Sequence, residues 1–352
     1  MGLGSFIARR LITFIPTLLG VLLVTYLIAY AIPTDPVRAW VGEKLMNPQT
    51  LEQIKAKYKF NAPWYEQFTF LMQELLTGQL EDPVRHRNVF DEISERFGVT
   101  VEVAIIGFLF LVAIGIPLGL LAAVFKDTPL DFAVRIMALV GSSLPAFVLY
   151  YFLILLLFVN IRTTYLAGIP EPTLDCKITI ASLPQTIPVI GHVTAAFGKV
   201  PMFAGIMCGE FNVVGDTFRR LYLPGLALGL LNGGFIARIV RNSLLDALSA
   251  EFIVYAKARG LRRLSVWKHA LKNAMVPVVT VLGLNFGGLL SGAIIAETVF
   301  NIPGIGRYMY EAIMRLNFPV IIACTFLVAI VYVTVNLVVD ILYAIIDPRI
   351  RY

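Results

Sequence analysis

Long uncharged apolar stretches alternate with short polar segments along almost the whole chain. A helix needs roughly 20 apolar residues to cross a bilayer, and a spanning helix satisfies its own backbone hydrogen bonds in lipid. The pattern therefore predicts an all-α integral membrane protein with six transmembrane helices. The predicted spans cover residues 11–34, 103–125, 136–161, 221–237, 273–296 and 316–346.

The first apolar stretch follows Arg9 and Arg10, a pattern that also occurs in signal peptides. It is longer than the apolar core of about 7–15 residues in a signal peptide, so we expect it to remain as the first span. The two arginines place the N-terminus in the cytoplasm, because cytoplasmic segments carry the excess of Lys and Arg. The polar residues 33–96 then lie outside, with short helices expected over residues 51–58 and 64–75, the second ending at Gly78.

Residues 162–220 contain a further uncharged stretch, 178–198, that is nearly long enough to span. Pro184 and Pro188 interrupt it, and a crossing here would move the most basic loop of the chain outside, against the positive-inside bias. We therefore expect a large external loop between the third and fourth spans, and both termini in the cytoplasm. Cys176 and Cys208 then share an oxidising compartment, where a disulfide bond and two unpaired thiols are equally compatible with the sequence.

Composition supports a membrane protein, since 58% of the 352 residues are hydrophobic and only 15% are charged. The net charge of +6 comes from cations beside apolar runs, which is the signature of membrane topology and not of nucleic-acid binding. No histidine or cysteine spacing suggests a metal site. The lipid bilayer is thus an expected partner of the chain, and a nucleic acid is not.

The most basic segment, residues 249–272, lies between the fourth and fifth spans. Good helix formers continue to Arg259, and Gly260 follows where a left-handed residue would end a helix. A second amphipathic helix with Leu264, Trp267 and Leu271 on one side is expected to lie along the inner membrane surface. A loop that only fixed orientation would not need a helix, a glycine stop and a second helix, so we predict a docking element for a partner.

Small residues recur at every fourth position in the fourth and fifth spans, which lets helices approach closely. Static packing explains most of them, while the functional alternative is that these two spans line a pathway. An amide is costly in hydrocarbon, so Asn232 and Asn285 either face a wet cavity or bond between helices. The candidate pathway residues are Asn232, Asn285, Gly229, Gly287 and Ser291.

Recognisable catalytic chemistry is missing from the sequence. Residues 191–199 have the wrong glycine spacing for a phosphate-binding loop, and neither a G-x-S-x-G nor an H-E-x-x-H pattern occurs. The centres of the predicted spans contain no carboxylate or lysine, whose presence costs at least about 2.5–3.5 kcal/mol and usually marks ion coupling. We therefore expect no enzyme, no cofactor bound by this chain, and an energy source on another protein.

The run from Tyr255 to Gly260, with Glu251 before it and Pro277 after it, resembles the cytoplasmic EAA loop of ABC importer permeases. It is most similar to the dipeptide/oligopeptide branch, although only Ala256 and Gly260 match the generic motif literally. The resemblance extends over nearly the whole chain, and the external loop after the third span is longer than usual in that branch. Further matching segments are residues 297–300, 303–306, 336–340 and 347–349.

The resemblance implies a type I ABC importer permease fold in the plasma membrane. It also implies a second homologous permease subunit, two ATPase subunits that hold ATP and magnesium, and an extracytoplasmic substrate-binding protein. The loop would dock on the ATPase through Glu251, Tyr255, Ala256, Ala258, Arg259, Gly260 and Arg262.

The expected substrate is a peptide, with an oligosaccharide importer of the same architecture as the alternative and a carrier or channel without ATP as a more remote one. The expected organisation is a first span with its external segment (1–96), followed by a permease core (97–352). Within the core lie the external insertion (162–220) and the coupling loop (249–272).

Overall fold

The computed structural model describes residues 3–31, 49, 52, 55–56, 58–161 and 200–346. Long helices dominate this part of the chain, and strands β1 (Glu81–Asp82) and β2 (Arg87–Asn88) pair antiparallel in a short hairpin. The helices, in chain order, are α1 (Leu3–Ala31), α4 (Trp64–Thr77), α5 (Val89–Val124), α6 (Pro129–Ser143), α7 (Ala146–Ile161), α10 (Pro201–Cys208), α11 (Phe211–Ser249), α12 (Glu251–Ala258), α13 (Arg263–Val299), α14 (Ile305–Met314) and α15 (Phe318–Ile346).

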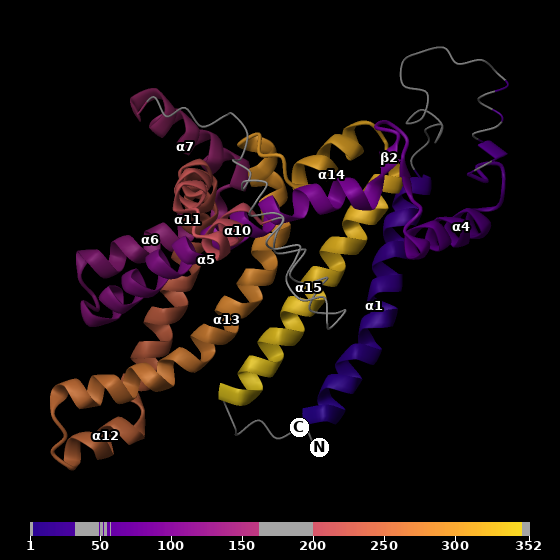
Figure 1. The fold of residues 1–352 in the computed structure, drawn as a ribbon. Coiled ribbons are helices and arrows are strands. Elements are labelled where there is room, and N and C mark those ends of the chain that lie inside the picture. Colours follow the sequence, from indigo (N-terminus) through magenta and orange to yellow (C-terminus); the bar gives the residue numbers. More distant parts are fainter. Residues whose placement is uncertain are drawn as a thin grey trace.

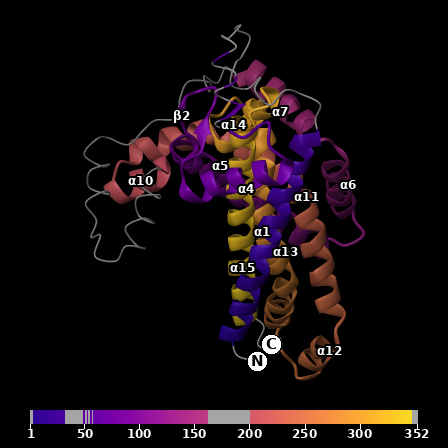
Figure 2. The same cartoon turned by 90° about the vertical axis from the view of Figure 1, so that its right-hand side faces the viewer.

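The bundle has two opposite ends (Figure 1; Figure 2). Helix α12 lies at one end, together with the start of α1 and the end of α15, and we name this side the α12 face. Helices α4 and α14 and the β-hairpin lie at the other end, the α14 face. The Arg10 guanidinium lies 2.9 Å from the Asp340 carboxylate and so ties α1 to α15 near the α12 face. The basic loop and both ends of the described chain are thus on one side, as the positive-inside pattern requires.

Five of the described helices are long and apolar enough to cross a bilayer, and the pair α6 and α7 adds a sixth crossing if it counts as one broken span. Each predicted span falls on one of these helices or on this pair. The predicted all-helical membrane architecture is therefore confirmed. The prediction of a continuous helix over residues 136–161 is wrong.

The break in the third predicted span lies at Leu144 and Pro145, where α6 and α7 meet at an angle of 113°. Leu144 has an extended backbone, with φ −77° and ψ 133°. A residue before proline is driven out of the helical region by a clash with the proline ring, so α6 ends here. Counting hydrophobic residues cannot detect such a bend, because the composition on both sides remains apolar.

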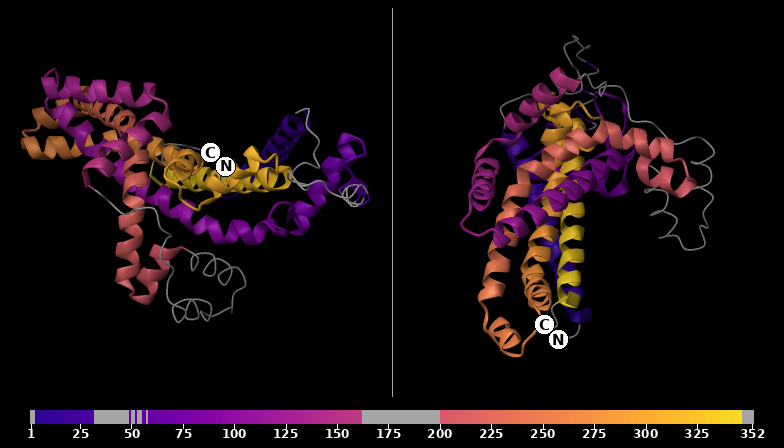
Figure 3. Two further views of the ribbon diagram at one scale, coloured as in Figure 1. Left: turned by 90° about the horizontal axis from the view of Figure 1, so that it is seen from above. Right: turned by 90° about the vertical axis from the view of Figure 1, so that its left-hand side faces the viewer.

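Helices α5 and α11 are longer than predicted. Asn88 starts α5 by accepting a hydrogen bond from the Phe90 amide at 2.8 Å, and α5 then runs through the expected boundary at residue 96 without a break. Helix α11 begins ten residues before the predicted span at Leu221 and continues to Ser249. The first turns of α11 and helix α10 project to the side of the bundle (Figure 2; Figure 3, left).

The short helix predicted to end at Gly78 is α4, and Gly78 has the expected left-handed backbone with φ +72°. Most of the helix predicted over residues 51–58 lies outside the described residues. Cys176 also lies outside them, while Cys208 ends α10. The Cys176–Cys208 bridge and the division into domains therefore stay predictions.

Candidate functional site

The loop between α11 and α13 forms the most distant part of the α12 face (Figure 1). Helix α12 covers Glu251–Ala258, and Gly260 follows with φ +74°. The Gly260 amide donates to the Lys257 carbonyl at 2.9 Å, and the Leu261 amide donates to the Ala256 carbonyl at 3.3 Å. This is the glycine-terminated helix end that the sequence predicts.

One side of α12 packs inward against the chain itself. Ile253 is 0% exposed and Ala256 is 8% exposed. They form an apolar cluster with residues of α5, α11 and α13, namely Ala123, Leu244, Ala247, Val266, Ala270 and Ala274. This cluster fixes α12 relative to three long helices.

The other side of the loop presents apolar side chains outward. Val254, Tyr255 and Leu264 are 62%, 69% and 83% exposed, and Phe252 and Leu261 are also exposed. An exposed cluster of large apolar residues marks an interaction surface. This patch at the end of the bundle could therefore insert into a groove on a partner protein.

Most of the predicted docking residues lie on the exposed surface of the loop. These exposed residues are Glu251, Tyr255, Ala258, Arg259, Gly260 and Arg262. Ala256 is the exception, because its side chain points into the apolar cluster. Ala256 therefore helps to position α12, and the docking roles of Ala256 and of the exposed residues stay predictions.

The prediction of a second amphipathic helix along the inner membrane surface is wrong. Residues 263–272 form the first turns of α13 and do not make a separate helix along the membrane surface. The buried stripe is Val266, Ala270 and Ala274, one position away from the predicted stripe. Small side chains allow α13 to approach α12 closely, and the larger Leu264 points outward.

The loop also carries exposed cations. Among the residues that the structure describes, Lys257, Arg259 and Arg262 have no carboxylate within ion-pair distance, and all three are exposed. Such cations suit an acidic partner surface or anionic lipid headgroups.

A cavity of about 220 Å³ lies between α7, α11 and α13 and brings together the two asparagines singled out in the sequence. Asn232 comes from α11 and Asn285 from α13. Each amide donates to a carbonyl one turn earlier in its own helix, to Leu228 at 3.3 Å and to Val281 at 2.8 Å. Neither amide bonds to the other helix, which leaves the two side chains facing the same cavity. Its other lining residues are Ala146, Tyr150, Leu228, Leu231, Gly288, Leu289 and Ile295.

The other candidate pathway residues have different surroundings. A Cβ atom added at Gly229 would lie 2.5 Å from Phe110 Cβ on α5, and one at Gly287 would lie 3.3 Å from the Tyr332 ring on α15. Both glycines therefore serve close helix packing and do not line this cavity. Ser291 belongs to α13, but its side chain lies outside the described residues.

The α14 face contains a buried polar network that the sequence analysis missed. The Asp82 carboxylate, 1% exposed, accepts hydrogen bonds from the Tyr308 hydroxyl at 2.7 Å and the Asn317 amide at 2.8 Å. Burial and the neighbouring Asp82 carboxylate raise the pKa of Tyr308, so its phenol stays protonated as the donor. The partners are more than 200 residues apart in sequence, which no local pattern reveals.

A second buried carboxylate, Glu92, lies beside this network. Its oxygens are 2.6 Å from Arg87, 2.6 Å from Arg96 and 3.3 Å from Arg85. Arg85 also contacts Glu311 of α14 at 3.0 Å, so the hairpin, the start of α5 and α14 are joined.

Helix α14 is held at its start by Glu297 from the end of α13. This carboxylate is 0% exposed and accepts hydrogen bonds from the Gly306 and Arg307 amides at 2.7 and 3.2 Å. A negative group at a helix N-terminus satisfies free backbone amides and complements the helix dipole. An added Cβ at Gly304 would clash with the Glu297 carboxylate, which explains the glycine. The motif around residues 297–306 was visible in the sequence, but this role was not.

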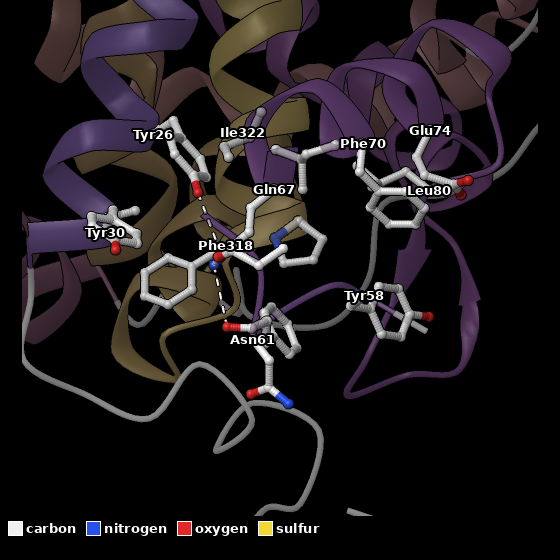
Figure 4. Close-up of a pocket in the computed structure, with 15 residues that line it drawn as sticks. Tyr26, Tyr30, Tyr58, Asn61, Gln67, Phe70, Glu74, Leu80, Phe318 and Ile322 are labelled. Atoms are coloured by element: carbon white, nitrogen blue, oxygen red, sulfur yellow. Dashed lines mark hydrogen bonds between the residues drawn. The ribbon is translucent and has the colours of Figure 1, made fainter. Parts of the chain in front are cut away.

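A larger cavity of about 410 Å³ lies near the α14 face between α1, α4 and α15 (Figure 4). Its lining includes the aromatic residues Tyr30, Phe70 and Phe318. Gln67 lies within it, accepting from the Tyr26 hydroxyl at 3.3 Å and donating to the Ala62 carbonyl at 2.8 Å. The polar groups here thus join the segment before α4 to α1.

Comparison with known proteins identifies matches over nearly the whole chain. Residues 115–352 match the family described as "Binding-protein-dependent transport system inner membrane component". Residues 3–104 match the N-terminal model of the same kind of membrane component.

Several relatives align with this chain from end to end. A dipeptide transport system permease protein, DppB, of Alkalihalophilus pseudofirmus is 35% identical over 350 residues, covering 99% of each chain. A di/tripeptide transport system permease protein of Pseudomonas aeruginosa is also 35% identical over 350 residues, again covering 99% of each chain. A glutathione transport system permease protein, GsiC, of Shigella flexneri is 32% identical over 350 residues with the same coverage.

Proposed function

The chain belongs to the family of inner membrane components of binding-protein-dependent transport systems, and we propose that it is the permease subunit of an ATP-driven importer of short peptides. It is a multi-pass protein of the plasma membrane. The names of its relatives refer to dipeptides, di/tripeptides and glutathione, which favours a small peptide over an oligosaccharide as the cargo.

The observation that carries the proposal is the construction of the loop on the α12 face. Its inner side is fixed by an apolar cluster, and its outer side presents Tyr255 and Val254 beside exposed cations. A loop of this kind is suited to insert into a groove of an ATPase subunit. The α12 face then lies in the cytosol, and the α14 face lies outside, where a substrate-binding protein delivers the peptide.

Each partner has a distinct task in this proposal. Two ATPase subunits hold ATP and magnesium, and this chain binds neither. A second, homologous permease subunit supplies the other half of the translocation pathway. Asn232 and Asn285 supply polar groups on this half, where amide groups can exchange hydrogen bonds with a passing peptide backbone.

Movement follows from the way α12 is attached. Closure of the ATPases on ATP displaces α12, and α12 is joined through one residue to α11 and through a short turn to α13. Both helices line the asparagine cavity. A displacement at the loop is therefore delivered directly to the walls of the pathway.

The test uses the complete complex in proteoliposomes, with labelled dipeptide and ATP. Tyr255→Asp places a charge on the exposed side of α12, and we expect loss of ATPase association and of uptake while the chain still inserts. Tyr310→Asp is the matched control, because Tyr310 is a 44% exposed aromatic residue on α14. Normal uptake by the Tyr255 variant, uptake by the chain alone without ATP, or competition by oligosaccharides and not by peptides would each overturn the proposal.

A further inference from the structure

A buried ion pair joins α6 to α11 between the asparagine cavity and the α12 loop. The Arg241 guanidinium contacts the Asp131 carboxylate through Nε at 2.6 Å and through Nη2 at 2.8 Å. Asp131 is 0% exposed, and the Arg241 side chain is 11% exposed. Such a two-pronged arginine–carboxylate pair fixes orientation as well as distance.

Asp131 has two further partners, and both lie close to it in sequence. The Asp127 amide donates to its Oδ2 at 3.0 Å, and Arg135 Nη2 donates to the same oxygen at 2.9 Å. Arg135 is one turn further along α6 and is 46% exposed. Only Arg241 therefore connects this carboxylate to another described helix.

Helices α6 and α11 continue in close contact beyond the ion pair. A Cβ atom added at Gly234 would lie 2.7 Å from the Ala138 Cα atom, and one added at Gly141 would lie 3.1 Å from the Leu231 carbonyl oxygen. The two helices thus touch at backbone distance over several turns, running in opposite directions. This contact restricts sliding near the asparagine cavity, and the ion pair holds the same two helices together at the end nearer α12.

Helix α6 is linked to the wall of the asparagine cavity. After the break at Leu144 and Pro145, α7 begins, and Ala146 and Tyr150 of α7 line the cavity together with Asn232. Tyr150 is 1% exposed, and its ring centroid lies 5.8 Å from that of Phe300. The break is only two residues long, so a displacement of α6 reaches this wall directly.

At its other end, the ion pair is close to the loop. Arg241 precedes Glu251 by ten residues, which corresponds to about 15 Å along a helix. Helix α11 continues without a break from the ion pair to Ser249, and Ala250 alone separates it from α12. A push on α12 thus reaches Arg241 along one helix.

We propose that Asp131 and Arg241 form a clamp that makes α6 follow α11 when the α12 loop moves, so that the α7 wall of the asparagine cavity opens or closes with each ATP cycle. Both are positioning residues, and neither contacts the peptide. The inference rests on the proposed function, since it assigns a route for the motion that ATP binding produces. Without the clamp, the ATPases still hydrolyse ATP, but α6 and the α7 wall of the cavity move less when α11 moves.

The experiment measures peptide imported per ATP hydrolysed by the complete complex in proteoliposomes. In Arg241→Gln, we expect ATP hydrolysis per complex to stay near the unmodified rate while peptide per ATP falls about tenfold, within the usual range of coupling between sites. Arg241→Lys keeps the charge but loses the two-pronged geometry, so we expect a smaller fall. Arg135→Gln is the control, because it removes a contact to the same carboxylate within α6, and we expect an unchanged ratio.

A double-mutant cycle of Asp131→Asn and Arg241→Gln separates the clamp from two independent effects, since the clamp predicts that the double variant is no worse than either single one. An unchanged peptide-to-ATP ratio in Arg241→Gln overturns the inference, as does a parallel fall of ATP hydrolysis and uptake. If Arg241→Gln does not insert, the ratio in Arg241→Lys decides in the same way. Failure of the proposed function gives a different result, because the unmodified complex itself would then show no ATP-dependent uptake.

Discussion

On the α14 face, the carboxylates of Asp82 and Glu92 are each 1% exposed and are surrounded by arginine, tyrosine and asparagine donors. On the α12 face, the loop is held by Ile253 and Ala256 through apolar contacts, and its cations point to the exterior. A buried ionic network fixes one geometry, because any displacement leaves a charge unpaired. An apolar cluster of small residues tolerates small shifts and leaves the polar groups for a partner. The comparison indicates a rigid polar network around Asp82 and Glu92 on the α14 face, which we call the platform. The α12 loop, residues 249–262, is less rigidly held and leaves its polar groups for a partner, and we call it the handle.

The comparison is tested most severely by removing the charge at the centre of the platform. Glu92→Gln leaves three arginines around a neutral amide, and we expect the free energy of unfolding to fall by about 3–5 kcal/mol, the usual cost of breaking a buried pair. Denaturant unfolding of the purified protein in detergent measures this. Glu95→Gln is the control, since Glu95 binds the same Arg87 at 2.8 Å but is 53% exposed, and an equal loss in both variants would contradict the prediction.

A smaller loss is expected from the neutral donor of the same platform. Tyr308→Phe removes the hydroxyl that donates to Asp82, and we expect a loss of about 1.5–3 kcal/mol for a hydrogen bond to a charged group. The same unfolding assay applies, with Tyr310→Phe as the exposed control on α14. Equal stability of the two variants would mean that the Asp82 network does not hold this face together.

The packing of the α12 loop is tested by a larger side chain on its buried side. Ala256→Leu inserts methylene groups between α12, α11 and α13, and we expect a cost of about 1–3 kcal/mol together with weaker binding of the ATPase subunits. Limited proteolysis of the loop and co-purification of the complex measure the two effects. Ala258→Leu places the same side chain on the exposed surface, and greater loop cleavage there than in the Ala256 variant would refute the inward orientation.

The smallest effect is expected at the glycine that ends α12. Gly260→Ala keeps open space around the new methyl group but forces alanine to adopt φ +74°, at a cost of about 1–2 kcal/mol. Gly215→Ala is the control, because that glycine also has open space but lies in helix α11. Loop protection in hydrogen exchange compares the variants, and identical protection would show that the left-handed turn is dispensable.

The sequence predicts the features that depend on local composition. Span positions follow from uncharged runs, and the end of α12 follows from Gly260, because both signals are carried by neighbouring residues. The side of α13 that is buried was misplaced by one position, since large residues such as Trp267 were weighted above the small residues Ala270 and Ala274. Where helices pack at short distance, small size and not hydrophobicity selects the buried face.

The missed features depend on distant contacts or on a single backbone clash. Asp82 meets Tyr308 and Asn317 only in the folded chain, and the Glu297 cap requires α13 and α14 to turn back on each other. Pro145 was present in the sequence, but the apolar residues around it dominated the pattern. The meeting of Asn232 and Asn285 was predictable only as two separate polar positions, because the cavity depends on how α11 and α13 pack.

Helix α13 has the α12 loop before its first turn and the Glu297 carboxylate in its last turn. Its 37 residues form one element with Pro277 inside it, and a straight helix of that length would extend about 55 Å. The same helix therefore meets the α12 loop at one face and holds the start of α14 at the other, so a single element joins the two faces of the bundle.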